Sequence, residues 1–207
     1  MNKKEIYFSL VGSLDRTLNF FGFKRTGKKL SKIYLDRPSL QFCRERWGYK
    51  ELVGVEVGVW KGKNAKNILS HFNMRKLYLI DYWDRSITNE GKKRTQDEFN
   101  KIKEYVYNYF SVNKKVQIIN KLSLDAVKDI EEEVDFVYID SSHDYETTIK
   151  EIKAYYPLIV HGGVLCGHDV KNLPIKSRGV LKAVYEFANE NNLIVFIDQP
   201  DWWIIKP

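Results

Sequence analysis

The stretch Val134–Asp169, VDFVYIDSSHDYETTIKEIKAYYPLIVHGGVLCGHD, predicts a strand, a helix and a second strand in succession. VDFVYID is a continuous run of apolar, β-branched and aromatic residues that ends at Asp140, which is typical of a buried parallel strand. GGVLCGHD has the same character and ends at Asp169. The residues between them place apolar side chains at helical spacing, with a break near Pro157 and an end at the following glycine pair.

The two strand ends predict a functional site. Parallel strands joined by a right-handed crossover have their carboxyl ends at the same edge of a sheet, so we expect Asp140 and Asp169 to be neighbours in space. Ligands of open α/β sheets bind at this edge. Each acid also has a histidine close by in the sequence, His143 after the first and His168 before the second.

Strand and helix patterns alternate along the remainder of the chain. The other expected strands are LVGVEVG, KLYLID, VQIIN, LIVFID and WWIIK, and the other expected helices are NAKNILSHF, QDEFNKIKEYVYNYF, LDAVKDIEE and RGVLKAVYEFANEN. This alternation predicts a doubly wound, mainly parallel α/β sheet with helices on both faces. The short link before WWIIK predicts an antiparallel last strand.

The first 50 residues lack strand signals. Leucines and a phenylalanine recur there at helical spacing, at Leu10, Leu14, Leu18 and Phe21. We therefore expect an N-terminal helical cap over residues 1–50, either packed on the domain or acting as a lid over the substrate, and one main domain over residues 51–207.

Size and composition favour one soluble α/β domain, since the chain has 207 residues, of which 43% are hydrophobic and 29% charged. No apolar run approaches the ~20 residues of a membrane span, so we expect a cytoplasmic protein. The net charge of +7 would suit a polyanionic partner, but the lysines are scattered and no nucleic-acid-binding signature is present. We therefore expect a solvated surface and no nucleic-acid partner, while homo-oligomer formation stays open. Cys43 and Cys166 form no disulfide framework, and Cys166 lies in a predicted buried strand.

The first strand leads into a glycine-containing turn with Glu56, Gly58 and Gly62. Such glycines let the backbone approach a ligand, and the helix that follows offers free N–H groups to an anionic group. The next strand ends at Asp81, whose carboxylate can accept hydrogen bonds from ribose hydroxyls. The bulky Trp60 disfavours a pyrophosphate in the turn, whereas a zwitterionic amino-acid moiety fits beside Glu56. The turn therefore favours S-adenosylmethionine (SAM) over a nicotinamide cofactor.

With these motifs the chain resembles the class I SAM-dependent methyltransferases. Within them it is similar to the methyltransferase domain 24 group, which includes the macrocin- and mycinamicin-type sugar O-methyltransferases. The resemblance covers about Leu52 to Lys206 and is carried by EVGVWKG, LID, YIDSSHDYE, HGGVLCGHD, RGVLKAVYEFA and DWWIIKP. It implies a Rossmann-like fold with a seven-stranded sheet, in which a closing helix and strand pair extend the plain Rossmann arrangement.

The resemblance also implies where SAM is held. The turn surrounds the methionine part, Asp81 holds the ribose, and Ser123 borders the adenine. For Ser123, the N-cap of the helix that starts near Leu124 is an equally open interpretation. The cofactor-binding candidates are Glu56, Gly58, Trp60, Gly62, Asn64, Asp81, Tyr82, Trp83, Ser123 and Asp140.

Methyl transfer to a hydroxyl requires that the acceptor oxygen be held beside the methyl group and lose its proton. A base or a metal ion can serve this step, and the sequence offers both. We predict His143 as the general base and Asp140, His168 and Asp169 as ligands of a divalent metal, manganese or magnesium. The enzymes that the chain resembles have a carboxylate at the position of His168. An imidazole there favours softer ions or means that no metal binds.

The D-x-x-H spacing of Asp140 and His143 resembles the macrolide-sugar enzymes, which have a histidine base, whereas catechol methyltransferases have a lysine at this position. We therefore predict an O-methyltransferase that modifies a hydroxyl of a sugar or glycan, such as a deoxysugar, in glycan biosynthesis. The alternatives are a catechol- or phenol-type small-molecule O-methyltransferase and a non-catalytic binding protein with the same fold. The absence of an N-P-P-Y type motif disfavours an amino-methylating nucleic-acid enzyme.

Overall fold

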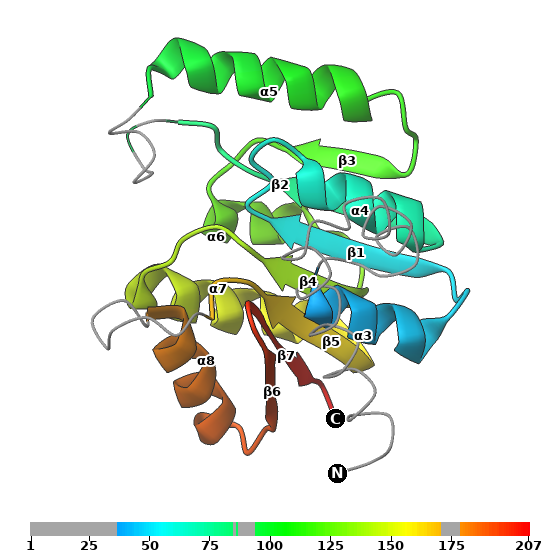
Figure 1. Cartoon of the computed structure of the whole chain (residues 1–207), viewed down its shortest axis with the longest axis vertical. Helices are drawn as coiled ribbons and strands as arrows, with labels where there is room; N and C mark the ends of the chain where they lie inside the picture. Colours follow the sequence, from blue (N-terminus) through cyan, green and yellow to red (C-terminus); the bar gives the residue numbers. More distant parts are fainter. Residues whose placement is uncertain (1–36, 85, 87–93, 171–178) are drawn as a thin grey trace, which may run out of the picture. The chain divides into compact units, whose positions relative to one another are not determined.

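The structure, a computed structural model, describes residues 37–84, 86, 94–170 and 179–207. Their strands are β1 (Leu52–Val57), β2 (Met74–Ile80), β3 (Val116–Ile119), β4 (Val134–Ile139), β5 (Ile159–Gly167), β6 (Val195–Asp198) and β7 (Asp201–Ile205). They form one seven-stranded sheet with the order β3-β2-β1-β4-β5-β7-β6 (Figure 1). The first five strands pair in parallel, and β7 runs antiparallel to both β5 and β6. The predicted doubly wound, mainly parallel sheet with an antiparallel last strand is confirmed.

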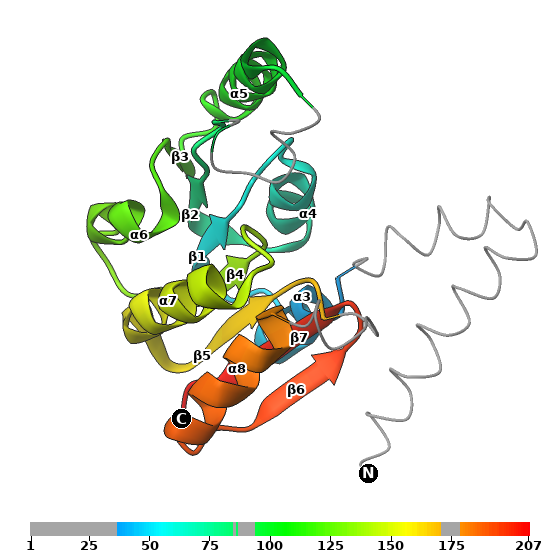
Figure 2. The same ribbon diagram turned by 90° about the vertical axis from the view of Figure 1, so that its left-hand side faces the viewer.

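Helices cover both faces of this sheet. They are α3 (Pro38–Trp47), α4 (Lys63–His71), α5 (Gln96–Phe110), α6 (Ser123–Ala126), α7 (Tyr145–Tyr155) and α8 (Gly179–Glu190), with 3-10 turns η3 (Val127–Asp129) and η4 (Tyr156–Leu158). Figure 2 shows α3, α4 and α5 on one face and α6, α7 and α8 on the other. Local signals in the sequence begin two of them. Thr95 and Glu98 form a reciprocal capping box at the start of α5, and Asp144 accepts a hydrogen bond from the Thr147 N–H (2.8 Å) to cap α7.

The central strands are buried, as their apolar composition predicts. Every residue of β1 and β4 is buried, and the core contains side chains of both strands together with those of α7 and α8. Cys43 and Cys166 are both buried and free. Each of the helices within the described residues is too short or too polar to cross a membrane.

Three local predictions were wrong. The expected helix LDAVKDIEE is limited to α6 and η3, because the chain becomes extended at Ile130, whose side chain enters the core. Leu122 occupies the N-cap position of α6 and no side chain caps this helix, so Ser123 is not its N-cap. β5 begins at Ile159, before the glycine pair that was expected to end the preceding helix. A register shift in the pairing with β4 accommodates Gly162 and Gly163 inside the strand.

Most of the predicted N-terminal cap, including its apolar residues up to position 21, lies outside the described residues. The part that the structure describes is α3, which packs against β5 and β7. Pro38 at the first helical position explains where this helix begins.

A buried carboxylate on β7 fixes the first turn of α3 to the sheet. Asp201 has no exposed surface, and its Oδ2 accepts hydrogen bonds from the backbone N–H (3.2 Å) and the hydroxyl (2.6 Å) of Ser39. The Tyr138 hydroxyl donates to Oδ1 (3.2 Å), and the Arg37 guanidinium lies 3.9 Å from the same oxygen. The carboxylate is therefore buried but not unpaired.

Because burial raises the pKa of Asp201 to about 6, this carboxyl is expected to make stability depend on pH. The carboxyl of Asp201 binds its proton more tightly in the folded chain than in the unfolded chain. Protonation therefore adds to the free energy of unfolding below pH ~4, and this contribution is lost as the pH rises through 6. Between pH 5 and pH 8 the free energy of unfolding of the wild type should fall by about 1 kcal/mol more than that of Asp201→Asn. Urea denaturation of both proteins at both pH values measures this difference, and an equal pH dependence would contradict it.

Candidate active site

The strand register brings the predicted site residues to one edge of the sheet. Pairing aligns the last residues of β3, β2, β1, β4 and β5 in one row. The residues directly after this row therefore lie side by side at the carboxyl edge, in the order Asn120, Asp81, Gly58, Asp140 and His168. Backbone hydrogen bonds continue the ladder to four of them, with the N–H groups of Gly58, Asp81, Asp140 and His168 donating to neighbouring strands.

Two acids and two histidines form a cluster beyond β4 and β5. His143 Nε2 lies 2.9 Å from Asp169 Oδ2, and His168 Nδ1 lies 3.2 Å from the same oxygen. His168 Nδ1 is also 3.6 Å from Asp140 Oδ1. The predicted meeting of Asp140 and Asp169 is thus present, and both histidines contact it. Asp169 has a left-handed backbone (φ +66°), a conformation that aspartate tolerates better than most residues and that is enriched at functional sites.

The cluster contains a candidate metal site. One ligand atom each from Asp140, His143 and Asp169 lie within 4.8 Å of one another. The histidine in this group is His143, whereas the sequence predicted His168 as the histidine ligand of the metal. His168 instead contacts both carboxylates through Nδ1, and its role as a metal ligand stays a prediction.

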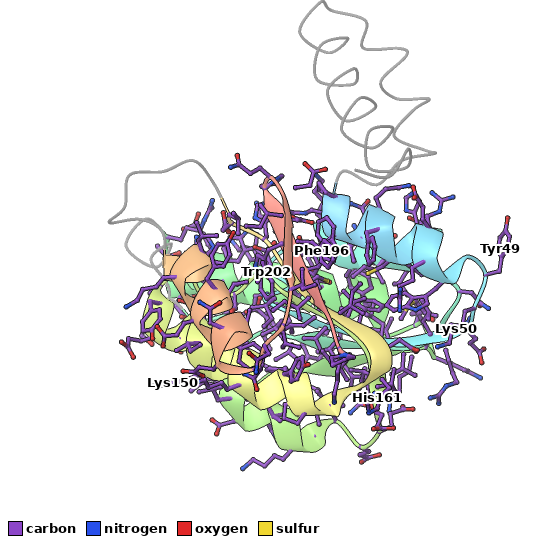
Figure 3. The ribbon with its side chains drawn as sticks, turned by 90° about the horizontal axis from the view of Figure 1, so that it is seen from below. Tyr49, Lys50, Lys150, His161, Phe196 and Trp202 are labelled. Atoms are coloured by element: carbon purple, nitrogen blue, oxygen red, sulfur yellow. The ribbon has the colours of Figure 1, made fainter. Side chains whose placement is uncertain are left out.

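A small pocket opens at this cluster. The described residues that line it are Ile139, Asp140, Ser142, His143, Thr148, His168, Asp169, Val180 and Trp202. Trp202 is fully buried on β7 and pairs with Gly167, whereas the exposed His161 lies near the start of β5, away from the pocket (Figure 3). The pocket therefore has a polar wall from the ends of β4 and β5 and an apolar wall from α8 and β7.

Burial and nearby positive charges act on the pKa of Asp140 in opposite directions. Burial raises the pKa of its carboxyl, while His168 and Arg37 act in the opposite direction. The Arg37 Nη2 donates to Asp140 Oδ2 at 3.2 Å, and both side chains are 20% exposed. The sequence did not predict Arg37 at this site, because it belongs to the segment interpreted as a cap.

The region predicted to bind the cofactor contains buried side-chain polar atoms that make no ordinary hydrogen bond. Glu56 is 1% exposed, and Glu56 Oε2 and both polar atoms of the Asn64 side chain make no hydrogen bond of ordinary geometry to any described residue. Burial and the nearby Asp140 carboxylate raise the pKa of Glu56 well above its ordinary value, although the Asn64 carboxamide lies near enough to lower it partly. Unpaired buried polar groups are costly and rare, so a ligand that pairs with them would be stabilised. An ammonium and a carboxylate, as in the methionine part of SAM, fit this pair.

Asp81 ties the glycine turn to the end of β2. Its Oδ2 accepts a hydrogen bond from the Trp60 N–H (2.7 Å) and its Oδ1 accepts one from the Trp83 N–H (3.0 Å). Trp83 is 2% exposed, and its indole donates to the Trp60 carbonyl (2.9 Å). The structure therefore shows a turn-bracing role for Asp81 and Trp83. Their predicted contacts with ribose and adenine remain predictions.

The two predicted glycines face protein atoms. A Cβ at Gly58 (φ +91°) would lie 2.2 Å from the Asp140 carbonyl oxygen, and one at Gly62 (φ +71°) would lie 2.5 Å from the Phe110 ring. Gly58 thus allows the loop after β4 to lie against the turn after β1. This close approach places the predicted cofactor turn and the acid–histidine cluster next to each other.

The region predicted at the adenine is supported from α7. The Tyr155 hydroxyl donates to the Ser123 carbonyl (2.6 Å). In the loop after β4, the Ser141 hydroxyl contacts both carboxylate oxygens of the buried Glu151 (2.6 and 2.7 Å). Tyr82 is 40% exposed beside Asp81. Sequence reasoning missed Glu151, because a glutamate on an expected amphipathic helix is normally solvent-exposed.

A sequence profile of the methyltransferase domain 24 family, described as a methyltransferase domain, matches residues 55–170. This match spans more than half of the chain, so the chain belongs to this family of methyltransferase domains. No curated protein shows significant sequence similarity to the chain.

Solved structures share the fold. The MycE methyltransferase from the mycinamycin biosynthetic pathway, solved with Mg and S-adenosylhomocysteine (SAH), has a TM-score of 0.54 and 13% identity over 82% of this chain and 49% of MycE. The O-methyltransferase NovP has a TM-score of 0.51 and 16% identity, covering 73% of this chain and 70% of NovP. An rRNA methylase from Streptococcus thermophilus has a TM-score of 0.51 and 12% identity, covering 83% and 96%. The chain spans about half of MycE, and at these identities the likeness concerns the fold alone.

Proposed function

We propose that the protein is a SAM-dependent O-methyltransferase that modifies a hydroxyl of a sugar or glycan. The observation that carries the proposal is the adjacency of two sites on neighbouring strands. Glu56 on β1 and Asn64 on α4 have buried side-chain atoms without an ordinary hydrogen bond, and the Asp140–His143–Asp169 cluster follows β4 and β5. Membership of the methyltransferase family supports SAM as the methyl donor.

When bound, SAM supplies a methyl group from its sulfonium centre. The carboxylate of Glu56 would pair with the ammonium of its methionine part, and the Asn64 carboxamide would bind the carboxylate. The N-terminus of α4 directly follows this turn and offers N–H groups to the same anionic end. These residues would hold the donor at the edge where the acid–histidine cluster lies.

His143 is the proposed general base. If its Nε2–H donates to Asp169 Oδ2, the basic lone pair is on Nδ1, and the carboxylate stabilises the imidazolium that forms when a hydroxyl proton is taken up. His143 is also largely exposed, with 61% of its side chain accessible, so an acceptor can reach it. The histidine at this position supports a sugar-like alcohol over a catechol.

The donor set also fits a divalent ion. Asp140 and Asp169 would supply carboxylate oxygens and His143 an imidazole nitrogen. The one lone pair of the neutral imidazole would then be bound to the ion, so this arrangement is an alternative to the general-base role of His143. A site with imidazole suits manganese and similar ions better than magnesium, which prefers oxygen ligands. A bound ion would lower the pKa of an acceptor hydroxyl.

Calorimetric titration with SAH, in the presence and absence of manganese or magnesium, tests the proposal. We expect one-site binding of SAH. Transfer from labelled SAM to sugars, phenols and RNA, screened in parallel, then identifies the acceptor. Absence of SAH binding under all conditions would contradict the enzyme assignment, and transfer to phenols or RNA in place of sugars would contradict the acceptor assignment.

A further inference from the structure

A positively charged side chain, Arg37, already contacts the candidate metal site. Arg37 precedes α3, and its guanidinium spans two acids with two different nitrogens: Nη2 is 3.2 Å from Asp140 Oδ2 and Nη1 is 3.9 Å from Asp201 Oδ1. The same guanidinium lies over the Tyr138 ring, 5.9 Å from its centroid. A single guanidinium is therefore shared by two carboxylates, one of which, Asp140, lines the pocket.

The arrangement fixes this cation in place. Asp201 is fully buried and needs a counter-ion, because a buried carboxylate without a cation is strongly destabilising. The Ser39 N–H and hydroxyl bind the same carboxylate and hold the first turn of α3 against β7. Arg37 lies two residues before Ser39, so its backbone is anchored beside the acids that it contacts.

Asp140 shares its two oxygens between two partners. Oδ2 accepts from Arg37, and Oδ1 faces His168 Nδ1 at 3.6 Å. A divalent ion bound by Asp140 would take one of these oxygens and would lie within a few ångströms of the guanidinium. Like charges at such distances repel strongly in a partly buried site. The positive charge of Arg37 therefore opposes metal binding at Asp140.

We propose that Arg37 is the resident cation of Asp140 and that a divalent metal binds Asp140, His143 and Asp169 only in competition with it. This inference rests on the metal site of the proposed function. Arg37 would be a positioning residue that holds Asp140 and sets how strongly the site takes up a metal.

Manganese titration of the full chain without SAM or acceptor tests this, with free Mn²⁺ followed by electron paramagnetic resonance. Arg37→Met keeps most of the side-chain length but removes the charge, so we expect it to bind Mn²⁺ at least ~10-fold more tightly than the wild type. Arg37→Lys keeps the charge and should stay within about threefold of the wild type. Arg46→Met is the matched control, because Arg46 lies on α3, the helix that Arg37 precedes, and its Nε donates to the backbone carbonyl of Gly162 (3.2 Å).

A second variant covers the case in which Arg37→Met does not fold. In Arg37→Met/Asp201→Asn the buried acid is neutralised together with its counter-ion, and tighter Mn²⁺ binding is again expected. Unchanged or weaker binding in both folded variants would overturn the proposal. So would the absence of Mn²⁺ binding in every variant, whereas SAH binding, measured separately, would still support the proposed methyltransferase function.

Discussion

A His143→Ala variant is expected to transfer methyl groups about 100-fold more slowly than the wild type, or worse, with unchanged affinity for SAH. The imidazole lies 2.9 Å from Asp169 Oδ2 at the mouth of the pocket, where it can accept a hydroxyl proton. It lies on the loop after β4, whereas the proposed methionine contacts, Glu56 and Asn64, lie on β1 and α4. Single-turnover transfer from labelled SAM measures the rate, and calorimetry measures the affinity.

The matched control for this variant is His161→Ala. His161 is exposed near the start of β5, away from the pocket, so its removal should leave both rate and affinity unchanged (Figure 3). Full activity of His143→Ala would show that another group takes the proton. A loss of SAH affinity equal to the loss of rate would show that His143 acts in binding the donor.

The sequence was sufficient for the parts of the site that depend on strand ends. Continuous apolar runs predict buried parallel strands, and three of these runs stop at an acid, so the sequence predicts Asp81, Asp140 and Asp169 at one edge of the sheet. The seven-stranded sheet and its antiparallel last strand followed from the same pattern. These features depend on local composition and on general rules of chain topology.

Contacts between distant segments could not be predicted in this way. Arg37 reaches Asp140 only because α3 packs on β5 and β7, and nothing in the residues near Arg37 indicates an acid over 100 positions away. The position of Gly58 against the Asp140 carbonyl is of the same kind. The sequence indicated a glycine turn, but the reason for that glycine is the loop of another strand.

The aromatic residues near the predicted cofactor turn show a further limit of prediction from sequence. Trp83 was predicted at the adenine because it follows Asp81 closely. In the structure its indole is buried and donates to the Trp60 carbonyl, and its ring packs edge-on against Tyr107. A large aromatic residue beside a site has two uses, ligand contact and packing, and sequence proximity alone does not separate them.

A Glu56→Gln variant is expected to bind SAH about 10- to 100-fold more weakly than the wild type while gaining stability without ligand. The lost affinity corresponds to the charge-assisted contact with the ligand ammonium. The gain, about 1 kcal/mol in the free energy of unfolding, arises because Gln removes a charge that is buried with an unpaired oxygen. Calorimetry and urea denaturation measure the two effects.

The pH dependence of SAH binding gives an independent signature of the same contact. Burial raises the pKa of Glu56, so at low pH a fraction of the protein molecules has this side chain protonated and unable to pair with the ligand ammonium. Binding of the ammonium favours the ionised form. SAH affinity should therefore rise with pH in the wild type, and this dependence should be reduced in Glu56→Gln. The matched change Glu104→Gln, at an exposed position on α5, should alter neither affinity nor stability. Greater stability of Glu56→Gln with wild-type SAH affinity would mean that the buried carboxylate has a role other than holding the methyl donor.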